Sequence, residues 1–342
     1  TERGAGYAQN RVWNGTMFLG SRLILWNGSD PPIEITSAGG VPTLANLIGT
    51  PPRAAFAVSH PTSRKVFAAG GLTPGGAATS PRMVYWSKTE DANSWTLANN
   101  AGSVDIPTDR GGNITGLLAW FGRILVFLEW EYGQITGTSG DVASANYFTY
   151  ARISDAVGAV AHRTLVNVST SPQFQSYKGI HKLEGMQQGF ADVNERYLSA
   201  KIEPYVRDLA TASLNTSHAV NYRDRNWYAL AVPGGGTVAP TQWLIYDYYL
   251  NAWTLFGTSL GDTVTFPSQT IYRASNAERW YVGANNGFIY QMDSGATDDG
   301  TNIRDQVQWI SDLDDPTMQK ILRHLYLTGD YNPDVAVGYT VD

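Results

Sequence analysis

The sequence predicts an all-β protein, and the main reasons are its composition and the turn residues between its short apolar segments. Of its 342 residues, 12% are aromatic and 35 are glycine, whereas only 16% are charged. Aromatic residues favour strands, and glycines favour the tight turns that join them. Short apolar segments separated by Gly, Asn and Asp recur along almost the whole chain. The low charge also indicates that part of the surface is covered by other molecules.

A repeat refines this prediction. A basic residue followed by an apolar strand occurs six times, at positions 22, 64, 123, 178, 225 and 279. The copies Arg22–Trp26 and Arg123–Phe127 match each other closely. Four-stranded blades of β-propellers repeat about every 40–50 residues. The repeat therefore predicts a six-bladed β-propeller that occupies 1–342 as a single domain, with a two-sheet sandwich as the alternative.

Two segments indicate hairpins within these units. Residues 93–97 and 251–255 share the pattern Asn-x-Trp-Thr-Leu, and each follows an apolar, aromatic segment and a polar turn. The preceding segments are 84–87 and 245–248. An apolar strand, a polar turn and a second strand opened by Trp together predict a hairpin in both places.

The two ends of the chain are expected to close the ring. Segments 307–310, 324–327 and 335–341 have the pattern of strands, and they would complete the blade that begins near Val12. Closure of this kind removes exposed sheet edges. Because the first residue is Thr1 and not Met, we expect the chain to be a fragment of a longer protein.

One segment breaks the β pattern and predicts a short inserted helix. Residues 198–209 carry an apolar face at helical spacing, formed by Leu198, Ile202, Tyr205, Val206 and Leu209. Pro204 is expected to start this helix or to kink it. In one interpretation the helix contacts a neighbouring subunit through Glu203, Tyr205 and Arg207. In the other it is a packed loop.

Several functional classes find no support in the sequence. A net charge of −6 provides no basic surface for gripping nucleic acid, and the lack of cysteine excludes disulfides and thiolate metal sites. No apolar stretch approaches the roughly 18 residues of a membrane span, so no membrane insertion is expected. The five histidines show no metal-ligand spacing, and the glycine runs lack the Lys and Ser/Thr of a phosphate loop. We therefore predict no catalytic residues, no metal and no cofactor, and a protein that is not an enzyme.

The acidic stretch 293–300 is the one candidate for a calcium site. It offers several carboxylate oxygens, which hard cations prefer, but it lacks the regular spacing and terminal Glu of an EF-hand. A solvated loop is the alternative, and we expect that one.

The middle of the chain resembles the tail nozzle proteins (also called tail hub or packaged-DNA stabilisation proteins) of short-tailed bacteriophages. Those proteins show, in order, Ile-Gly-x-x-Ala, Gly-Ile-x-x-Leu-Glu-Gly and Leu-Ser-x-Lys-Ile. The similar stretches here are 153–166, 177–185 and 198–204. Ser176-Tyr177-Lys178-Gly179 replaces the Ser-x-Asp-Gly turn that is common in the family. Looser similarity extends over 13–33, 114–137 and 222–253.

The resemblance implies a structural virion protein located in the tail. Copies of the chain, as a homo-hexamer, would form a ring below the portal and adaptor. Genomic DNA would be retained and later ejected through this ring, without sequence-specific binding. An acidic protein is compatible with DNA that slides without sticking. The alternative is a carbohydrate- or receptor-binding β-propeller that uses its many Trp and Tyr side chains.

Overall fold

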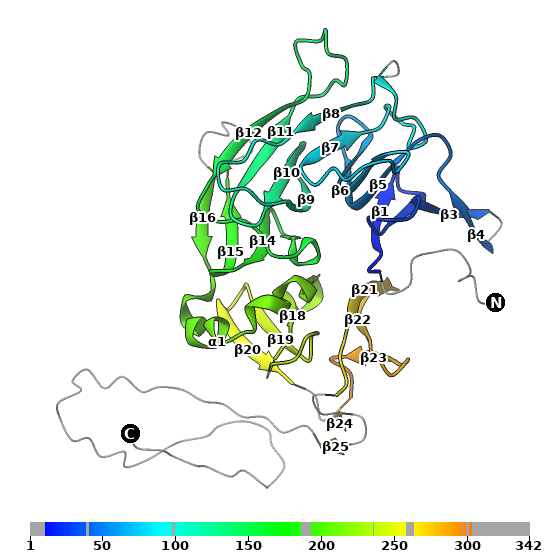
Figure 1. Ribbon diagram of the computed structural model, residues 1–342. Coiled ribbons are helices and arrows are strands. Elements are labelled where there is room, and N and C mark those ends of the chain that lie inside the picture. The colour runs from blue at the N-terminus through cyan, green and yellow to red at the C-terminus, as the bar shows by residue number, and fades with distance from the viewer. Residues whose placement is uncertain are drawn as a thin grey trace, which may run out of the picture. The chain divides into compact units, whose positions relative to one another are not determined.

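Six antiparallel sheets follow one another along the chain and build a β-propeller with one short α-helix. The computed structural model describes residues 11–38, 41–97, 100–185, 193–234, 236–257, 263–295, 297–298 and 301–302. By its contacts the chain divides into two units, 1–301 and 302–342. The six sheets all lie in the first unit, and Figure 1 shows them succeeding one another in chain order around a common axis.

The first three sheets each contain four strands in sequence order. Sheet 1 consists of β1 (Asn14–Phe18), β2 (Arg22–Trp26), β3 (Ile33–Ala38) and β4 (Val41–Asn46). Sheet 2 consists of β5 (Pro52–His60), β6 (Lys65–Pro74), β7 (Met83–Trp86) and β8 (Gly102–Asp105). Sheet 3 consists of β9 (Ile114–Trp120), β10 (Arg123–Leu128), β11 (Tyr132–Thr136) and β12 (Thr149–Ser154).

The last three sheets continue the same plan. Sheet 4 consists of β13 (Val166–Val168), β14 (Ser171–Ser176), β15 (Gly179–Glu184) and β16 (Asn194–Tyr197). Sheet 5 consists of β17 (His218–Tyr222), β18 (Trp227–Val232), β19 (Gln242–Asp247) and β20 (Ala252–Phe256). Sheet 6 consists of β21 (Ser268–Ala274), β22 (Ala277–Gly283) and β23 (Ile289–Met292). A two-stranded sheet of β24 (Thr297–Asp298) and β25 (Thr301–Asn302) follows.

The six-fold repeat is confirmed, but in one sheet it marks a different strand. In five sheets the basic residue of the repeat lies in the second strand or next to its start. In sheet 4, Lys178 instead precedes the third strand, β15. The reason is the inner strand β13, which has only three residues and turns into β14 through Ser169, at φ 57°. This hairpin contains no basic residue, so the repeat detected the next strand.

Of the two predicted hairpins, one is confirmed and one is wrong. β19 and β20 pair with Tyr246 opposite Trp253. Trp95, by contrast, lies outside any strand, and β7 pairs with β8, which begins at Gly102. The Asp91 carboxylate accepts the Asn93 N–H at 3.0 Å and tightens the turn before Trp95. The Trp95 indole then packs edge-on against Trp26, with ring centroids 6.2 Å apart, in the core between sheets 1 and 2.

The first blade differs from the expected closure by both termini. Its four strands, β1 to β4, all come from residues 14–46, so the blade that begins near Val12 is complete without a C-terminal strand. The segments 307–310, 324–327 and 335–341, which were expected to supply strands, lie outside the described residues.

The hydrophobic core is divided among the interfaces between successive sheets. Five buried clusters fill the spaces from sheets 1 and 2 to sheets 5 and 6, and their large side chains include Trp26, Phe67, Phe127, Tyr228 and Trp280. Each of these five side chains is fully buried. A strand between two such clusters is covered on both faces, which explains why β10 is buried along its whole length and is apolar after Arg123.

The predicted helix is present in the connection from sheet 4 to sheet 5. A 3₁₀ helix, η3 (Ser199–Ile202), leads directly into α1 (Glu203–Arg207), and Pro204 stands in the first turn of α1 as expected. Leu198 and Leu209 are buried in the cluster between sheets 4 and 5, and Val206 packs against it. The predicted apolar face is therefore confirmed. Within the described residues, no helix is long and apolar enough to cross a membrane.

Candidate functional site

The inner strands of sheets 1, 4, 5 and 6 begin around a cavity of about 310 Å³ at one end of the propeller axis. Sheets 1, 5 and 6 contribute Asn14, His218 and Ser268, which stand at the first positions of β1, β17 and β21. His162 and Arg163 belong to the 3₁₀ helix η2 (His162–Thr164), which leads into β13. The volume is near the lower end of the range for small-molecule sites.

His162 closes the cavity toward sheets 2 and 3. Its ring lies 5.0 Å from the ring of Phe56 on β5, and its Nδ1 accepts the Leu117 N–H of β9 at 3.4 Å. An Nδ1 that accepts leaves the proton of the neutral imidazole on Nε2. Burial, with a smaller contribution from the neighbouring Arg163 guanidinium, lowers the pKa of His162 to about 4.

His218 approaches the cavity from sheet 5 and is 2% exposed. Its Nε2–H donates to the Phe266 carbonyl oxygen at 2.7 Å, because a carbonyl can only accept. Its Nδ1 is therefore an acceptor, and among the described residues it has no hydrogen-bond partner. Burial first, and Arg163 second, lower the pKa of His218 to about 4 despite the bond to Phe266.

Arg163 is the charged residue of this cavity. Its NH1 donates to the Pro267 carbonyl at 2.6 Å and its NH2 to the Thr216 carbonyl at 3.4 Å. Burial lowers its pKa below the usual value. No described carboxylate forms an ion pair with Arg163, and the described lining residues include no Asp or Glu. The guanidinium therefore lacks charge compensation within the part of the chain that is described.

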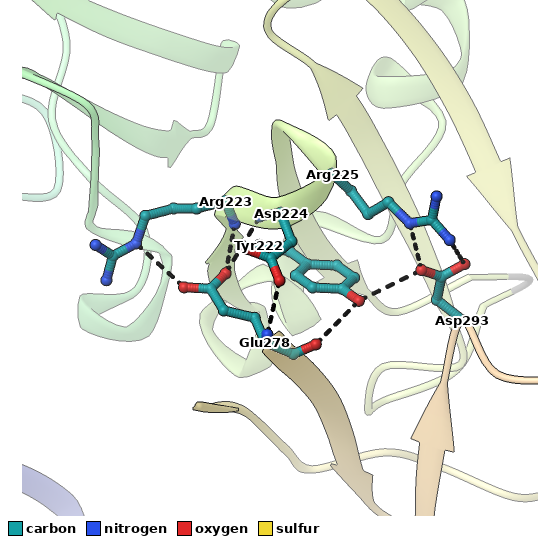
Figure 2. A network of polar contacts seen from close by, with 6 residues as sticks. All are labelled: Tyr222, Arg223, Asp224, Arg225, Glu278 and Asp293. Carbon is teal, nitrogen blue, oxygen red and sulfur yellow. Dashed lines mark hydrogen bonds and ion pairs between the residues drawn. The ribbon is translucent and has the colours of Figure 1, made fainter. Parts of the chain in front are cut away.

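A second polar cluster joins sheets 5 and 6 at the other end of their inner strands. Figure 2 shows Glu278 of β22 beneath the turn that follows β17. Its carboxylate accepts the backbone N–H groups of Arg223 and Asp224 at 2.7 and 3.4 Å, and it pairs with the Arg223 guanidinium at 3.4 Å. The Asp224 carboxylate in return accepts the Glu278 N–H at 2.7 Å.

The remaining members of this cluster are Tyr222, Arg225 and Asp293. The Asp293 carboxylate accepts from Arg225 Nε at 2.7 Å and from NH2 at 3.3 Å, and the Tyr222 hydroxyl donates to it at 3.4 Å (Figure 2). The first carboxylate of the acidic stretch 293–300 is thus bound to an arginine. Among the described residues no group of three or more His, Cys, Asp or Glu could hold a metal ion.

The predicted subunit-contact residues divide into two kinds. Glu203 and Arg207 are exposed and line an open pocket of about 300 Å³ together with Tyr177, Lys178 and Tyr197. Tyr205 is half-buried against the cluster between sheets 4 and 5, and burial raises its pKa to about 12. Arg207 and Glu203 are therefore available to another molecule, whereas Tyr205 mainly anchors α1.

Sequence reasoning missed the cavity. His162 and His218 are 56 positions apart, and neither forms a local motif. They share only a place next to the start of an inner strand. That position is a usable signal once the blade boundaries are known, because the starts of inner strands converge on the axis.

Comparisons with known proteins point to the fold alone. No protein-family model and no curated protein matches the chain. Among solved structures, the chain is similar to YCF48 bound to a D1 peptide, with a TM-score of 0.50 and 11% identity over 84% of this chain and 79% of that one. A streptogramin B lyase structure matches with a TM-score of 0.47 and 8% identity, over 82% of this chain and 81% of that one. The likeness to YCF48 supports the β-propeller fold.

Proposed function

We propose that the protein is a structural component of the tail of a short-tailed bacteriophage. Several copies assemble into a nozzle or hub ring below the portal and adaptor, and the genome is retained and then ejected through this ring. The place of action is the virion tail. The observation that carries the proposal is that the stretches resembling tail nozzle proteins depend on one another in the folded chain.

Two of these stretches are joined directly by hydrogen bonds. The Leu198 N–H donates to the Ile180 carbonyl at 2.8 Å, and the Ile180 N–H donates to the Ser199 hydroxyl at 3.0 Å. Gly179 has φ 130°, and a Cβ there would lie 2.5 Å from the Ser199 hydroxyl. Gly-Ile and Leu-Ser therefore form one unit, which supports reading their order in the sequence as a shared structure.

The third stretch attaches this unit to its neighbours. The Ala159 N–H donates to the Leu128 carbonyl of β10 at 2.9 Å, and the Val160 N–H donates to the Gln175 carbonyl of β14 at 3.0 Å. A Cβ at Gly158 would lie 2.0 Å from the Leu128 oxygen, so a glycine is required there. The segment thus joins sheets 3 and 4, and all three stretches contribute side chains to the buried cluster between sheets 4 and 5.

The proposed route of the genome lies between copies of the chain, and the size of the axial cavity supports this choice. At about 310 Å³ the cavity is on the scale of a small molecule, whereas the major groove of B-DNA alone is about 12 Å wide. We therefore do not place the genome along the axis of one propeller. The proposed passage lies between copies of the chain arranged in a closed ring.

The exposed charges of α1 are the proposed contact between copies in the ring. Glu203 and Arg207 line an open pocket beside Lys178, so charges of both signs meet at this surface. A ring requires a head-to-tail interface, in which this patch meets a different patch of the next copy. We propose a homo-hexamer on this plan.

Native mass spectrometry combined with negative-stain imaging tests the proposal. We expect rings of six copies with an axial hole. The double variant Glu203→Arg, Arg207→Glu is expected to give folded monomers, whereas Glu90→Arg, at an exposed site on sheet 2, leaves the rings intact. A chain that stays monomeric by itself, and that also fails to bind tail-deficient particles carrying portal and adaptor, contradicts the proposal.

A further inference from the structure

We infer that the turn between β22 and β23 is the surface that meets α1 of the next copy in the ring, with Phe288 inserted into the pocket beside that helix. The inference rests on the proposed ring and names its second surface. A head-to-tail interface needs two different surfaces of one chain. The pocket lies between sheet 4 and α1, whereas the turn belongs to sheet 6, so sheet 5 separates the two surfaces (Figure 1).

Exposed apolar side chains select this turn. Only two places in the described chain expose two large apolar side chains in succession, the Tyr-Leu pair at 249–250 and the Phe-Ile pair at 288–289. The first pair lies on the same side of the chain as α1, because the neighbouring Asn251 carbonyl accepts from Lys201 Nζ of η3 at 3.0 Å. The second pair lies where β23 begins, and its side chains are 65% and 76% exposed. Exposed apolar groups placed together mark contact surfaces.

The turn is fixed by its own hydrogen bonds. The Ala284 N–H donates to the Phe288 carbonyl at 2.9 Å, and the Phe288 N–H donates to Asn286 Oδ1 at 3.1 Å. The Asn285 N–H donates to the Thr265 carbonyl at 2.9 Å, and Asn285 Oδ1 accepts the Thr265 N–H at 3.1 Å. A surface that is already ordered loses little conformational entropy when it binds a partner.

The pocket beside α1 suits an aromatic side chain. Its volume is about 300 Å³, and it is lined by apolar surface and by charges of both signs from Tyr177, Lys178, Tyr197, Glu203, Val206 and Arg207. The two cations favour the face of an aromatic ring. No described carboxylate forms an ion pair with Arg207. A phenyl ring also brings no polar atom that would need a partner, and buried aromatic anchors carry a large share of the binding energy of an interface.

Disulfide cross-linking tests the contact, because the chain contains no cysteine of its own. Glu203→Cys and Ile289→Cys are combined in one chain, which leaves Phe288 and the two cations of the pocket unchanged. We expect mild oxidation to link successive copies into a ladder of up to six. Each single variant should give at most dimers, because a head-to-tail contact brings two different positions together. Equal cross-linking in a single variant would overturn the inference.

Truncation of the anchor provides a second measurement. Phe288→Ala is expected to weaken association by roughly tenfold or more, as measured by the protein concentration at which rings dissociate in native mass spectrometry. Tyr272→Ala, on β21 of the same sheet, removes a ring that is 58% exposed and serves as the matched control. Its association should stay unchanged within about twofold. Equal losses in the two variants would contradict the role of Phe288.

The cross-linking results also separate this inference from the proposed ring. Rings without a ladder would overturn the contact and leave the hexamer standing. A ladder without rings would support the contact and count against the hexamer. If neither forms in solution, the contact is overturned, and the proposed ring then depends on binding to tail-deficient particles.

Discussion

Sheets 5 and 6 meet at both ends of their inner strands, and the two meeting points treat charge in opposite ways. Where β17 ends, Arg223 and Arg225 face the carboxylates of Glu278 and Asp293. Where β17 begins, Arg163 faces backbone carbonyls and no described carboxylate. The difference shows that charges are paired within the chain at the end of β17, whereas at its beginning the charge of Arg163 is not neutralised by any described residue.

The polar cluster at the end of β17 is hydrogen-bonded and paired within the chain. The Glu278 side chain is 4% exposed, and its carboxylate accepts two backbone N–H groups besides pairing with Arg223. A buried carboxylate is tolerated when it is paired and hydrogen-bonded in this way. At the cavity, by contrast, no described residue supplies a counter-charge for Arg163 or a hydrogen-bond donor for Nδ1 of His218. Four measurements can sharpen or break this contrast.

Acidification is expected to have the largest effect, and to act at the cavity. The pKa of His162 and of His218 is about 4 in the folded chain, against about 6.5 when unfolded. Their contribution to stability is complete above pH 6.5 and is lost as the pH falls toward 4, because only the unfolded chain binds the protons. The free energy of unfolding should fall by about 1.4 kcal/mol per pH unit for each histidine in this window. Urea unfolding from pH 7.5 to 4.5 measures the slope.

The control for this experiment is Arg163→Gln. The Arg163 guanidinium contributes to lowering both pKa values, so its removal should raise them. The pH range over which the histidines lose their contribution to stability should then become narrower. An identical pH profile in the variant would show that Arg163 does not act on the histidines.

Glu278→Ala, in the polar cluster at the end of β17, is expected to have the next largest effect on the free energy of unfolding. It leaves the N–H groups of Arg223 and Asp224 without their buried acceptor and removes the pair between Glu278 and the exposed Arg223 guanidinium. We expect a loss of about 3 kcal/mol in the free energy of unfolding by urea. The exposed pair of Arg64 and Glu90 provides the comparison, and Glu90→Ala should cost at most about 0.5 kcal/mol. Similar losses in the two variants would mean that the buried carboxylate of Glu278 does not stabilise the contact between sheets 5 and 6 more than an exposed ion pair would.

Asp293→Asn should have a smaller effect at the same end of β17. The Arg225 side chain is 54% exposed, so solvent screens its pair with Asp293. We expect a loss of about 1 kcal/mol that shrinks when salt is raised from 0.05 to about 1 M, because exposed ion pairs are screened. Unfolding curves at the two salt concentrations measure it, and a loss that salt does not alter would count against this assignment.

Arg163→Gln is expected to change stability least, by less than about 1 kcal/mol at pH 7.5. The variant loses hydrogen bonds to two carbonyls but also relieves an uncompensated, half-buried charge, and these effects oppose each other. Thermal and urea unfolding provide the measurement. A loss as large as that of Glu278→Ala would mean that Arg163 stabilises the fold as strongly as Glu278 does, and the contrast between the two ends of β17 would disappear.

The repeat of basic residue and apolar strand was sufficient to predict the six blades, because one side chain type recurs at the same turn. It failed in sheet 4, where the three residues of β13 are too few to show a pattern. The separate Asn-x-Trp-Thr-Leu pattern failed at Trp95, because residues 93–97 resemble 251–255 while the turn at Asp91 sends the indole into the core. Local composition does not record which side of a turn a side chain takes.

The cavity lay further beyond sequence reasoning. His162 and Arg163 meet His218 only because two separate connections, the one into β13 and the one into β17, reach the axis at the same end. Their distances in the chain reflect the lengths of whole blades, so no motif of fixed spacing can reveal them. The helix, in contrast, was predictable from Leu198 to Leu209, since its apolar face is formed by residues close together in the sequence.

The bonds of Glu278 also bear on the order in which the chain acquires its structure. Every described sheet is built from consecutive strands, so each can form hairpins soon after its own residues leave the ribosome. Glu278 follows Arg223 by 55 residues, and the turn after β17 therefore has no partner for its N–H groups until a whole further blade has been synthesised. During that interval we expect the fifth blade to be the part of the nascent chain most easily unravelled.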